Sequence, residues 1–107
     1  MSAAGKDKGD LDALIEEITV DAYDDDEQLM GFQNAFEEDA NLPCSGQVVG
    51  EDVEVLSVSI GDHRRELIAT CERAGRQYDI ALLDIDLRAD AATSQLVAAY
   101  KRWLGYR

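Results

Sequence analysis

The fold of this chain is decided by residues 53–60, which read Val-Glu-Val-Leu-Ser-Val-Ser-Ile. Apolar residues alternate with polar ones at Val53 and Val55, and the alternation slips by one position at Leu56 before it resumes. A period of two predicts a β-strand with one buried face, and a slip of one residue predicts a β-bulge or a sharp bend. Small barrels bend their strands in this way, so the stretch predicts a bent strand of a small β-barrel.

Short strands and tight turns surround this stretch. We expect further strands at 47–49, 66–72 and 77–83, joined by polar turns at 50–52, 61–64 and 74–76. Short sequential strands with tight turns favour an SH3-like or Sm-like barrel.

Helical spacing replaces the period of two on both sides of the strands. Apolar residues recur every three or four positions from Asp10 onward, again in residues 24–42, and again after Asp90. Pro43 ends the second segment because proline disfavours helical geometry at the preceding residue. We therefore expect one α+β domain over residues 1–107, with a flexible tail at 1–9, a helical segment at 10–42, the barrel at 43–87 and a C-terminal helix at 88–107.

Negative charge is concentrated in the first part of the chain. Residues 1–43 hold 13 acidic residues against two lysines, a balance of −11, whereas residues 44–107 hold 10 acidic against eight basic residues, a balance of −2. Adaptation to high salt would acidify the whole surface, so the asymmetry favours a face that binds cations or docks basic partners. The net charge of −13 argues against nucleic-acid binding, which requires clustered lysine and arginine.

The absence of long apolar runs and the spacing of the two cysteines indicate the expected compartment. No segment resembles a signal peptide or approaches the ~20 apolar residues of a membrane span, so we expect a soluble, cytoplasmic protein with no membrane partner. Cys44 and Cys71 match no CxxC pattern, and we expect both to be reduced and buried as small hydrophobic residues. The single histidine, His63, cannot complete a convincing zinc site.

Signals of catalysis are nearly absent, so we do not expect an enzyme. The chain has no glycine-rich phosphate loop and no serine or cysteine placed beside a base. His63 falls in an expected hairpin, where an exposed turn residue is the ordinary interpretation. Tyr78, Tyr100 and Trp103 fall on apolar faces and are expected in the core.

Three groups of acidic residues are candidates for metal binding. They are Asp24-Asp25-Asp26-Glu27, Glu37-Glu38-Asp39 and Asp84/Asp86/Asp90. Calcium is the natural ion, because it takes six to eight hard oxygen ligands in flexible arrangements. An EF-hand loop is excluded at Asp24 and at Asp84, since the position that requires glycine holds Leu29 in one and Ala89 in the other.

Each group also has an interpretation without a metal. Acids in the first turn of a helix, as at 24–27, interact favourably with the helix dipole, and Asp84 and Asp86 are typical of a polar strand end. The acids at 37–39 differ, because carboxylates in a last turn oppose the dipole and a cation would relieve that cost. Both interpretations stay open.

A resemblance to a known family begins at residues 18–27, Ile-Thr-Val-Asp-Ala-Tyr-Asp-Asp-Asp-Glu, and at Met30-Gly31-Phe32. These residues resemble the opening signature of the CcbP-type family of calcium-binding proteins. The resemblance continues through Leu42-Pro43, residues 50–56 and residues 78–86, and covers roughly residues 15–104.

This resemblance implies a small acidic protein that binds Ca2+ without an EF-hand, through an Sm-like or SH3-like barrel joined to N-terminal helices, with a role in calcium signalling. By position, the helix-end acids 37–39 match one acidic site of the family. Glu66, beside Asp62 in the expected hairpin, matches another, although two arginines in the same hairpin would repel Ca2+.

The predicted ion is Ca2+, and its predicted ligands are Glu37, Glu38, Asp39, Asp62, Glu66, Asp84 and Asp86. We expect a non-enzymatic Ca2+-binding protein that acts as a buffer or a sensor of modest affinity. The alternative is an acidic interaction module that docks basic partner proteins without a specific metal site. An Sm-like barrel that binds nucleic acid is suggested by the fold alone and opposed by the charge.

Overall fold

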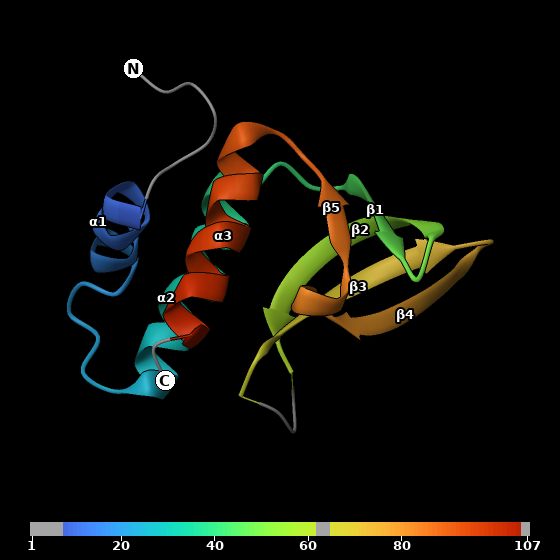
Figure 1. Cartoon of the computed structure of the whole chain (residues 1–107). Coiled ribbons are helices and arrows are strands. Elements are labelled where there is room, and N and C mark those ends of the chain that lie inside the picture. The colour runs from blue at the N-terminus through green and yellow to red at the C-terminus, as the bar shows by residue number, and fades with distance from the viewer. Residues whose placement is uncertain (1–7, 62–64, 106–107) are drawn as a thin grey trace, which may run out of the picture.

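The computed structural model describes residues 8–61 and 65–105, which form three helices, five strands and one 3-10 turn. In chain order the elements are α1 (Lys8–Ile18), α2 (Asp25–Asp39), β1 (Cys44–Val48), β2 (Glu51–Ile60), β3 (Leu67–Arg73), β4 (Arg76–Ala81), the 3-10 turn η1 (Leu82–Asp84), β5 (Asp86–Arg88) and α3 (Ala91–Gly105). The helices gather on one side and the strands form a curved sheet on the other (Figure 1). No helix within these two ranges is long and apolar enough to cross a membrane.

The predicted bend in the central strand is confirmed. The register of β2 against β3 shifts between Val55 and Ser57, which leaves Leu56 as the extra residue of a bulge. The phase slip in the sequence marks this position because one additional residue moves the following apolar side chains back to the buried face.

Two-residue turns close two of the hairpins. Val49 and Gly50 connect β1 to β2, and Ala74 and Gly75 connect β3 to β4, all four with positive φ. Positive φ at both central residues is type I′ geometry, whose twist matches that of the flanking strands. The expected turn at 50–52 is therefore corrected, because residues 51 and 52 already belong to β2, and β1 starts at Cys44 rather than at residue 47.

The strands form one antiparallel sheet in the order β4-β3-β2-β1-β5. Within the described residues β4 and β5 are the two edges and do not pair, so the expected closed SH3-like or Sm-like barrel is corrected to an open, curved sheet. The barrel does not close because of the segment that follows β4. The turn at Leu82–Asp84 redirects the chain, and the three residues of β5 pair with Ser45–Gln47 of β1 before the chain enters α3.

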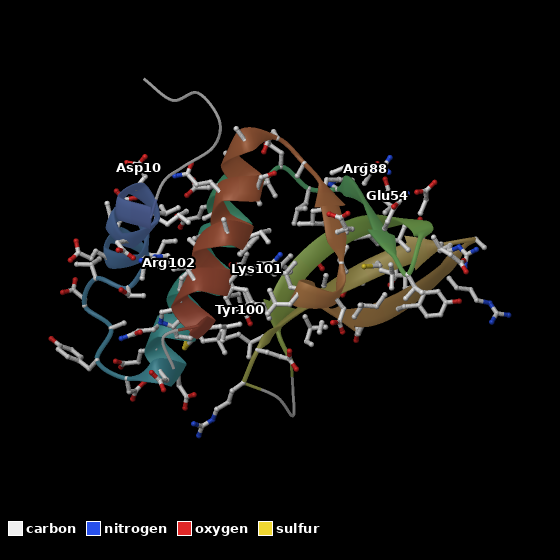
Figure 2. All side chains as sticks on the ribbon, viewed as in Figure 1. Asp10, Glu54, Arg88, Tyr100, Lys101 and Arg102 are labelled. Carbon is white, nitrogen blue, oxygen red and sulfur yellow. The ribbon has the colours of Figure 1, made fainter. Side chains whose placement is uncertain are left out.

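Aromatic residues of α2 and α3 form the centre of the core. The ring of Phe32 lies 5.7 Å from that of Tyr100 and 5.1 Å from that of Trp103, centroid to centroid. Trp103 Nε1 donates to Gln28 Oε1 at 2.7 Å, and the backbone N–H of Leu67 donates to the Tyr100 hydroxyl oxygen at 2.8 Å. The core positions predicted for Tyr100 and Trp103 are confirmed, and the Tyr100 bond fixes α3 to β3 (Figure 2).

The core position predicted for Tyr78 is wrong. Its side chain is 47% exposed, because β4 is an edge strand whose first four residues all remain in contact with solvent. Of the two cysteines, Cys71 is buried as predicted and Cys44 is only half-buried, and both thiols are free.

The first helix is fastened to the last one. Arg102 on α3 donates from Nε and Nη2 to the two carboxylate oxygens of Asp12 on α1, at 2.6 and 3.1 Å. Two parallel bonds of this kind give a fixed geometry as well as charge attraction. Arg102 therefore holds α1 beside α3, while the neighbouring Lys101 extends from α3 toward the sheet (Figure 2).

Candidate functional site

The acidic run that opens α2 stabilises the start of the helix. Asp24 Oδ1 accepts a hydrogen bond from the N–H of Glu27 at 2.8 Å, and Glu27 Oε1 accepts one from the N–H of Tyr23 at 2.7 Å. This arrangement is similar to a capping box, except that Glu27 reaches the residue before the N-cap Asp24 rather than Asp24 itself. Asp26 additionally lies 3.5 Å from Arg65 Nε. The interpretation of these acids without a metal is therefore supported.

The predicted ligands Glu37, Glu38 and Asp39 lie in the last turn of α2, and all three are exposed. That turn contains no basic residue, so their charges add to the negative end of the helix dipole. They do not form one cluster. Glu37 lines a groove against β2, whereas Glu38 and Asp39 line a separate pocket against α1. The predicted three-residue site is thus divided between two sides of the helix.

The pocket between α1 and α2, called here the α1–α2 pocket, is rich in oxygen atoms. Its volume is about 430 Å³. It is lined by Glu17, Ile18, Gly31, Asn34, Ala35, Glu38 and Asp39. The pocket thereby brings a third carboxylate and a side-chain amide to the two predicted acids at the end of α2.

Gly31 allows this pocket to form. A Cβ atom at residue 31 would lie 2.5 Å from the carbonyl oxygen of Ile18, so only glycine lets the end of α1 approach α2 here. The last turn of α1, like that of α2, carries no basic residue, and the end of each helix is the negative end of its dipole. The pocket therefore joins three carboxylates with the ends of two helices, an electrostatic setting that attracts a cation.

Glu17 and Asn34 are absent from the predicted ligand set. In the sequence, Glu17 looks like an ordinary residue on the polar face of α1, and Asn34 looks like one on the polar face of α2. The signal that points toward both is Gly31, because an isolated glycine inside a helix often marks a close packing contact.

The remaining predicted ligands are dispersed. Asp84 is exposed in the turn η1, and Asp86 opens β5 opposite Gln47 of β1. Asp62 lies outside the described residues, and Glu66 is half-buried just before β3. Within the described part of the chain, no three histidine, cysteine, aspartate or glutamate side chains are arranged as a ready-made metal site.

Asp90, a member of the third acidic group, caps α3. Its Oδ1 accepts a hydrogen bond from the N–H of Thr93 at 2.8 Å, and its Oδ2 accepts one from Asn41 Nδ2. The Thr93 bond, followed by the Asn41 bond, holds the pKa of Asp90 below its ordinary value. Asp90 therefore fastens the start of α3 to the segment that follows α2.

Comparison with known proteins agrees with this architecture. A family model of the CcbP type, described as calcium binding, matches residues 12–104. The crystal structure of Anabaena CcbP is similar with a TM-score of 0.79 and 25% sequence identity, over 97% of this chain and 95% of that chain. A calcium-binding protein in the calcium-binding form is similar with a TM-score of 0.76 and 24% identity, over 99% of this chain and 97% of that chain. No curated protein matches the sequence.

These similarities confirm the resemblance to the CcbP-type family that begins at residues 18–27. The chain shares with the Anabaena CcbP structure a fold of three helices and an open five-stranded antiparallel sheet within the described residues, in place of the closed barrel that the resemblance implied. Because the family model spans nearly the whole chain, this protein belongs to the CcbP family of calcium-binding proteins.

Proposed function

We propose that this protein binds Ca2+ in the α1–α2 pocket and acts as a calcium buffer. Membership of a calcium-binding family supports the choice of ion, and the three carboxylates that line the pocket support its place. Ca2+ takes six to eight oxygen ligands, from carboxylates, amide carbonyls and water. Glu17, Glu38 and Asp39 can each offer two oxygens, and Asn34 can offer one, so the lining falls within that range.

The electrostatic gain comes from charges that repel one another without the ion. Glu38 and Asp39 oppose the dipole of their own helix, and Glu17 occupies the same position at the end of α1. A divalent cation between them converts repulsion into attraction. Because all three side chains are exposed, water screens the interaction, and we expect water to complete the coordination shell.

The affinity that this arrangement supports is modest. The three carboxylates line one pocket without converging as a ready-made ligand set. Binding must therefore fix the rotamers of long glutamate side chains, at a cost in conformational entropy. A site assembled on binding is weaker than one that is organised in advance.

The packing of the fold favours a buffer over a sensor. Among the described residues, no buried side-chain nitrogen or oxygen lacks a hydrogen-bond partner, so the core is complete without an ion. The pocket also lies outside the aromatic core around Phe32. A ligand shifts a conformational equilibrium only by its differential affinity for two states, and no second packing is needed here to hold Ca2+.

We also place the protein in the cytoplasm. Cys44 and Cys71 are both free, as is usual where thiols are kept reduced. A calcium buffer with unpaired thiols is suited to that compartment.

Calorimetric titration with Ca2+ and with Mg2+ at matched ionic strength tests the proposal. We expect a defined stoichiometry for Ca2+ and weaker binding of Mg2+, which demands octahedral geometry and dehydrates reluctantly. Glu17→Gln should weaken Ca2+ binding, whereas Glu16→Gln, an exposed neighbour on α1 that does not line the pocket, should change it little. Both variants remove one charge, so they share the same change in long-range field.

Two results would contradict the proposal. If both variants lose the same affinity for Ca2+, the ion does not bind in the α1–α2 pocket. Diffuse binding of Ca2+ and Mg2+ alike, strongly dependent on salt and without stoichiometry, would favour an acidic module that docks basic proteins.

A further inference from the structure

Of the two edges of the sheet, the one at β4 is open to solvent. The free side of β5 faces α3, and side chains of both elements line the narrow space between them. β4 runs along the outer border of the sheet, and no other element of the described chain lies beyond it (Figure 1). Its first four residues are all exposed. A strand from outside can therefore join this sheet at β4 and not at β5.

The turn before β4 determines which of its backbone groups are free. Arg73 and Arg76 flank the two-residue type I′ turn and are register partners, so they exchange backbone hydrogen bonds. The bonded side alternates along an antiparallel strand, and the register of β3 against β4 is continuous, so Tyr78 also bonds to β3. Gln77 and Asp79 therefore direct their N–H and C=O groups away from the sheet, where they are available to another strand.

Little in the sequence of β4 guards this edge. Natural sheet edges are usually blunted by proline, by lysine or by a bulge. β4 has six residues, none of them proline or lysine, and it pairs with β3 without a bulge. Its one arginine and one aspartate sum to zero charge, in a chain of net charge −13. Two copies of this chain thus repel one another less at β4 than across the acidic helices α1 and α2.

We propose that two copies of this chain pair through β4, antiparallel, about a two-fold axis at Tyr78. This register sets Gln77 of each copy opposite Asp79 of the other, and each such pair exchanges both of its free backbone bonds. Because α3 covers the free side of β5, a third copy has no edge to join. The contact is therefore isologous and closes as a dimer.

The side chains on both faces of β4 suit this axis. Tyr78 is the register partner of the buried Cys71, so it lies on the inner face of the sheet, yet it is 47% exposed. Across the axis it meets Tyr78 of the other copy. On the outer face, Thr70 Oγ1 donates to Asp79 Oδ1 at 3.1 Å, which leaves Oδ2 to accept from the Gln77 amide of the other copy.

A neighbouring register is less favourable. An axis at Asp79 would use the same free backbone groups, but it would set the two Asp79 carboxylates directly opposite one another. Like charges at directly opposite positions are destabilising, whereas an aromatic pair there contributes stability. The axis at Tyr78 therefore satisfies the backbone without opposing two like charges.

This dimer should be weak and should tighten as salt is added. A contact through one short strand lies at the small end of specific interfaces, below about 1,200 Å² in total, where association is transient. We expect a dissociation constant on the order of 0.1–1 mM. Each copy carries a charge of −13, and salt shortens the screening length from about 10 Å at 0.1 M to about 3 Å at 1 M. Sedimentation of the full-length chain in EDTA should show association at least about twofold tighter at the higher salt.

Cysteine cross-linking tests the position of the axis. Opposite residues that share no backbone bonds lie about 4.5 Å apart at Cα, within disulfide range, whereas diagonal neighbours lie about 7–8 Å apart, beyond it. Tyr78→Cys should therefore give a disulfide-linked dimer in air with copper phenanthroline, and Asp79→Cys should not. Both variants carry Cys71→Ala, because Cys71 lies opposite residue 78 in the same chain and would capture its thiol. Cys71→Ala alone measures the background.

Gln77→Pro tests whether the backbone carries the contact. Proline removes the outward N–H of residue 77 and leaves the bonds to β3 in place, and edge strands tolerate it at such positions. The net charge is unchanged, and association in the sedimentation experiment should be lost. The melting temperature reports whether the variant is folded, and the cross-linking pair still decides the matter if it is not.

Three outcomes would overturn the proposal. The first is a single monomeric species at millimolar protein and high salt. The second is cross-linking of Asp79→Cys as rapid as that of Tyr78→Cys, which places the contact elsewhere. The third is association that salt weakens, which indicates ion pairs between copies at another surface. Because every measurement is made in EDTA, each outcome is distinguishable from failure of the α1–α2 pocket as a calcium site.

Discussion

The carbonyl oxygen of Ile18 lies 2.5 Å from the point where a Cβ atom on residue 31 would stand, a distance that real Cβ atoms essentially never show. Gly31 is therefore the residue that lets the end of α1 rest on α2. The same contact brings Glu17 to the pocket that Glu38 and Asp39 line. One glycine thus determines both the packing of two helices and the composition of the proposed calcium site.

Gly31→Ala should destabilise the protein, although alanine favours a helix over glycine by about 1 kcal/mol. The new Cβ meets backbone, which cannot rotate away, so we expect a net loss of about 1–3 kcal/mol in the free energy of unfolding. Urea denaturation measures it. Gly105→Ala is the control, since nothing lies within 4 Å of its Cβ, and it should be neutral or slightly stabilising. A gain in stability for Gly31→Ala would show that the helices do not meet at this point.

Val49→Asn should stabilise the protein. Val49 has φ 51° and is 96% exposed. This β-branched residue therefore adopts a left-handed conformation, and its side chain makes no buried contacts that would offset the strain. Asparagine tolerates this conformation, and we expect about 1 kcal/mol of added stability in thermal or urea unfolding. Val20→Asn serves as the control, because Val20 is 66% exposed and is not among the residues with positive φ. Equal effects at both positions would show that lost apolar surface, not strain, is responsible.

The two thiols should react slowly with iodoacetamide in the folded protein, and Cys71 more slowly than Cys44. Burial, and then Asp90 for Cys44 and Asp79 for Cys71, raises the pKa of each thiol and leaves little thiolate. A folded pKa above the unfolded one means that the folded state holds the proton more tightly. Stability should therefore fall as pH rises above about 8.5, the ordinary thiol pKa. Rapid labelling of both thiols without urea would contradict their burial.

Asp90→Ala should lower the melting temperature at neutral pH, because it removes the cap of α3 and the bond to Asn41. The pKa of Asp90 is lowered in the fold, so its contribution is present above the ordinary carboxyl pKa and is lost as pH falls through the folded value. The difference between the two proteins should shrink as the melting curves are taken into acid. Asp84→Ala, at an exposed position of η1, should change the melting temperature less. A constant difference at all pH values would exclude the ionised carboxylate as its source.

The parts of the fold that local patterns determine could be predicted from the sequence. The bulge at Leu56 follows from side-chain alternation. Pro43 predicts that α2 ends shortly before it, and the helix does end at Asp39, although proline itself restricts only Leu42. Barrel closure could not be predicted in this way. Leu82 and Leu83 continue the apolar run of β4 in the sequence, and their 3-10 turn is apparent only in the structure, where Leu82 is buried and Leu83 is exposed.

The residues of the candidate site also fall into those that local patterns predict and those that only tertiary contacts bring together. The acids at the end of α2 are visible in the sequence because their conflict with the dipole is local to one helix. The separation of Glu37 from Glu38 and Asp39, and the addition of Glu17, depend on which elements pack against each side of α2. Those contacts join residues far apart in the chain, and no pattern of spacing within one segment encodes them.

The last prediction concerns which acids hold the ion. Glu38→Gln with Asp39→Asn should weaken Ca2+ binding much more than Asp25→Asn with Asp26→Asn, as measured by calorimetry. Each double variant removes two charges, so long-range attraction changes equally. Asp25 and Asp26 already have a favourable partner in the start of α2, whereas the other pair lines the α1–α2 pocket at the negative end of the helix.

The two double variants should also differ without calcium. Loss of the Asp25 and Asp26 charges should lower the melting temperature, because it removes a favourable interaction with the helix start and the ion pair from Asp26 to Arg65. Loss of the Glu38 and Asp39 charges should leave it unchanged or raise it slightly, because it removes like-charge repulsion. If the first change abolishes Ca2+ binding and the second is silent, the ion lies at the start of α2 rather than at its end. If both leave binding intact, the ligands come from neither end of this helix.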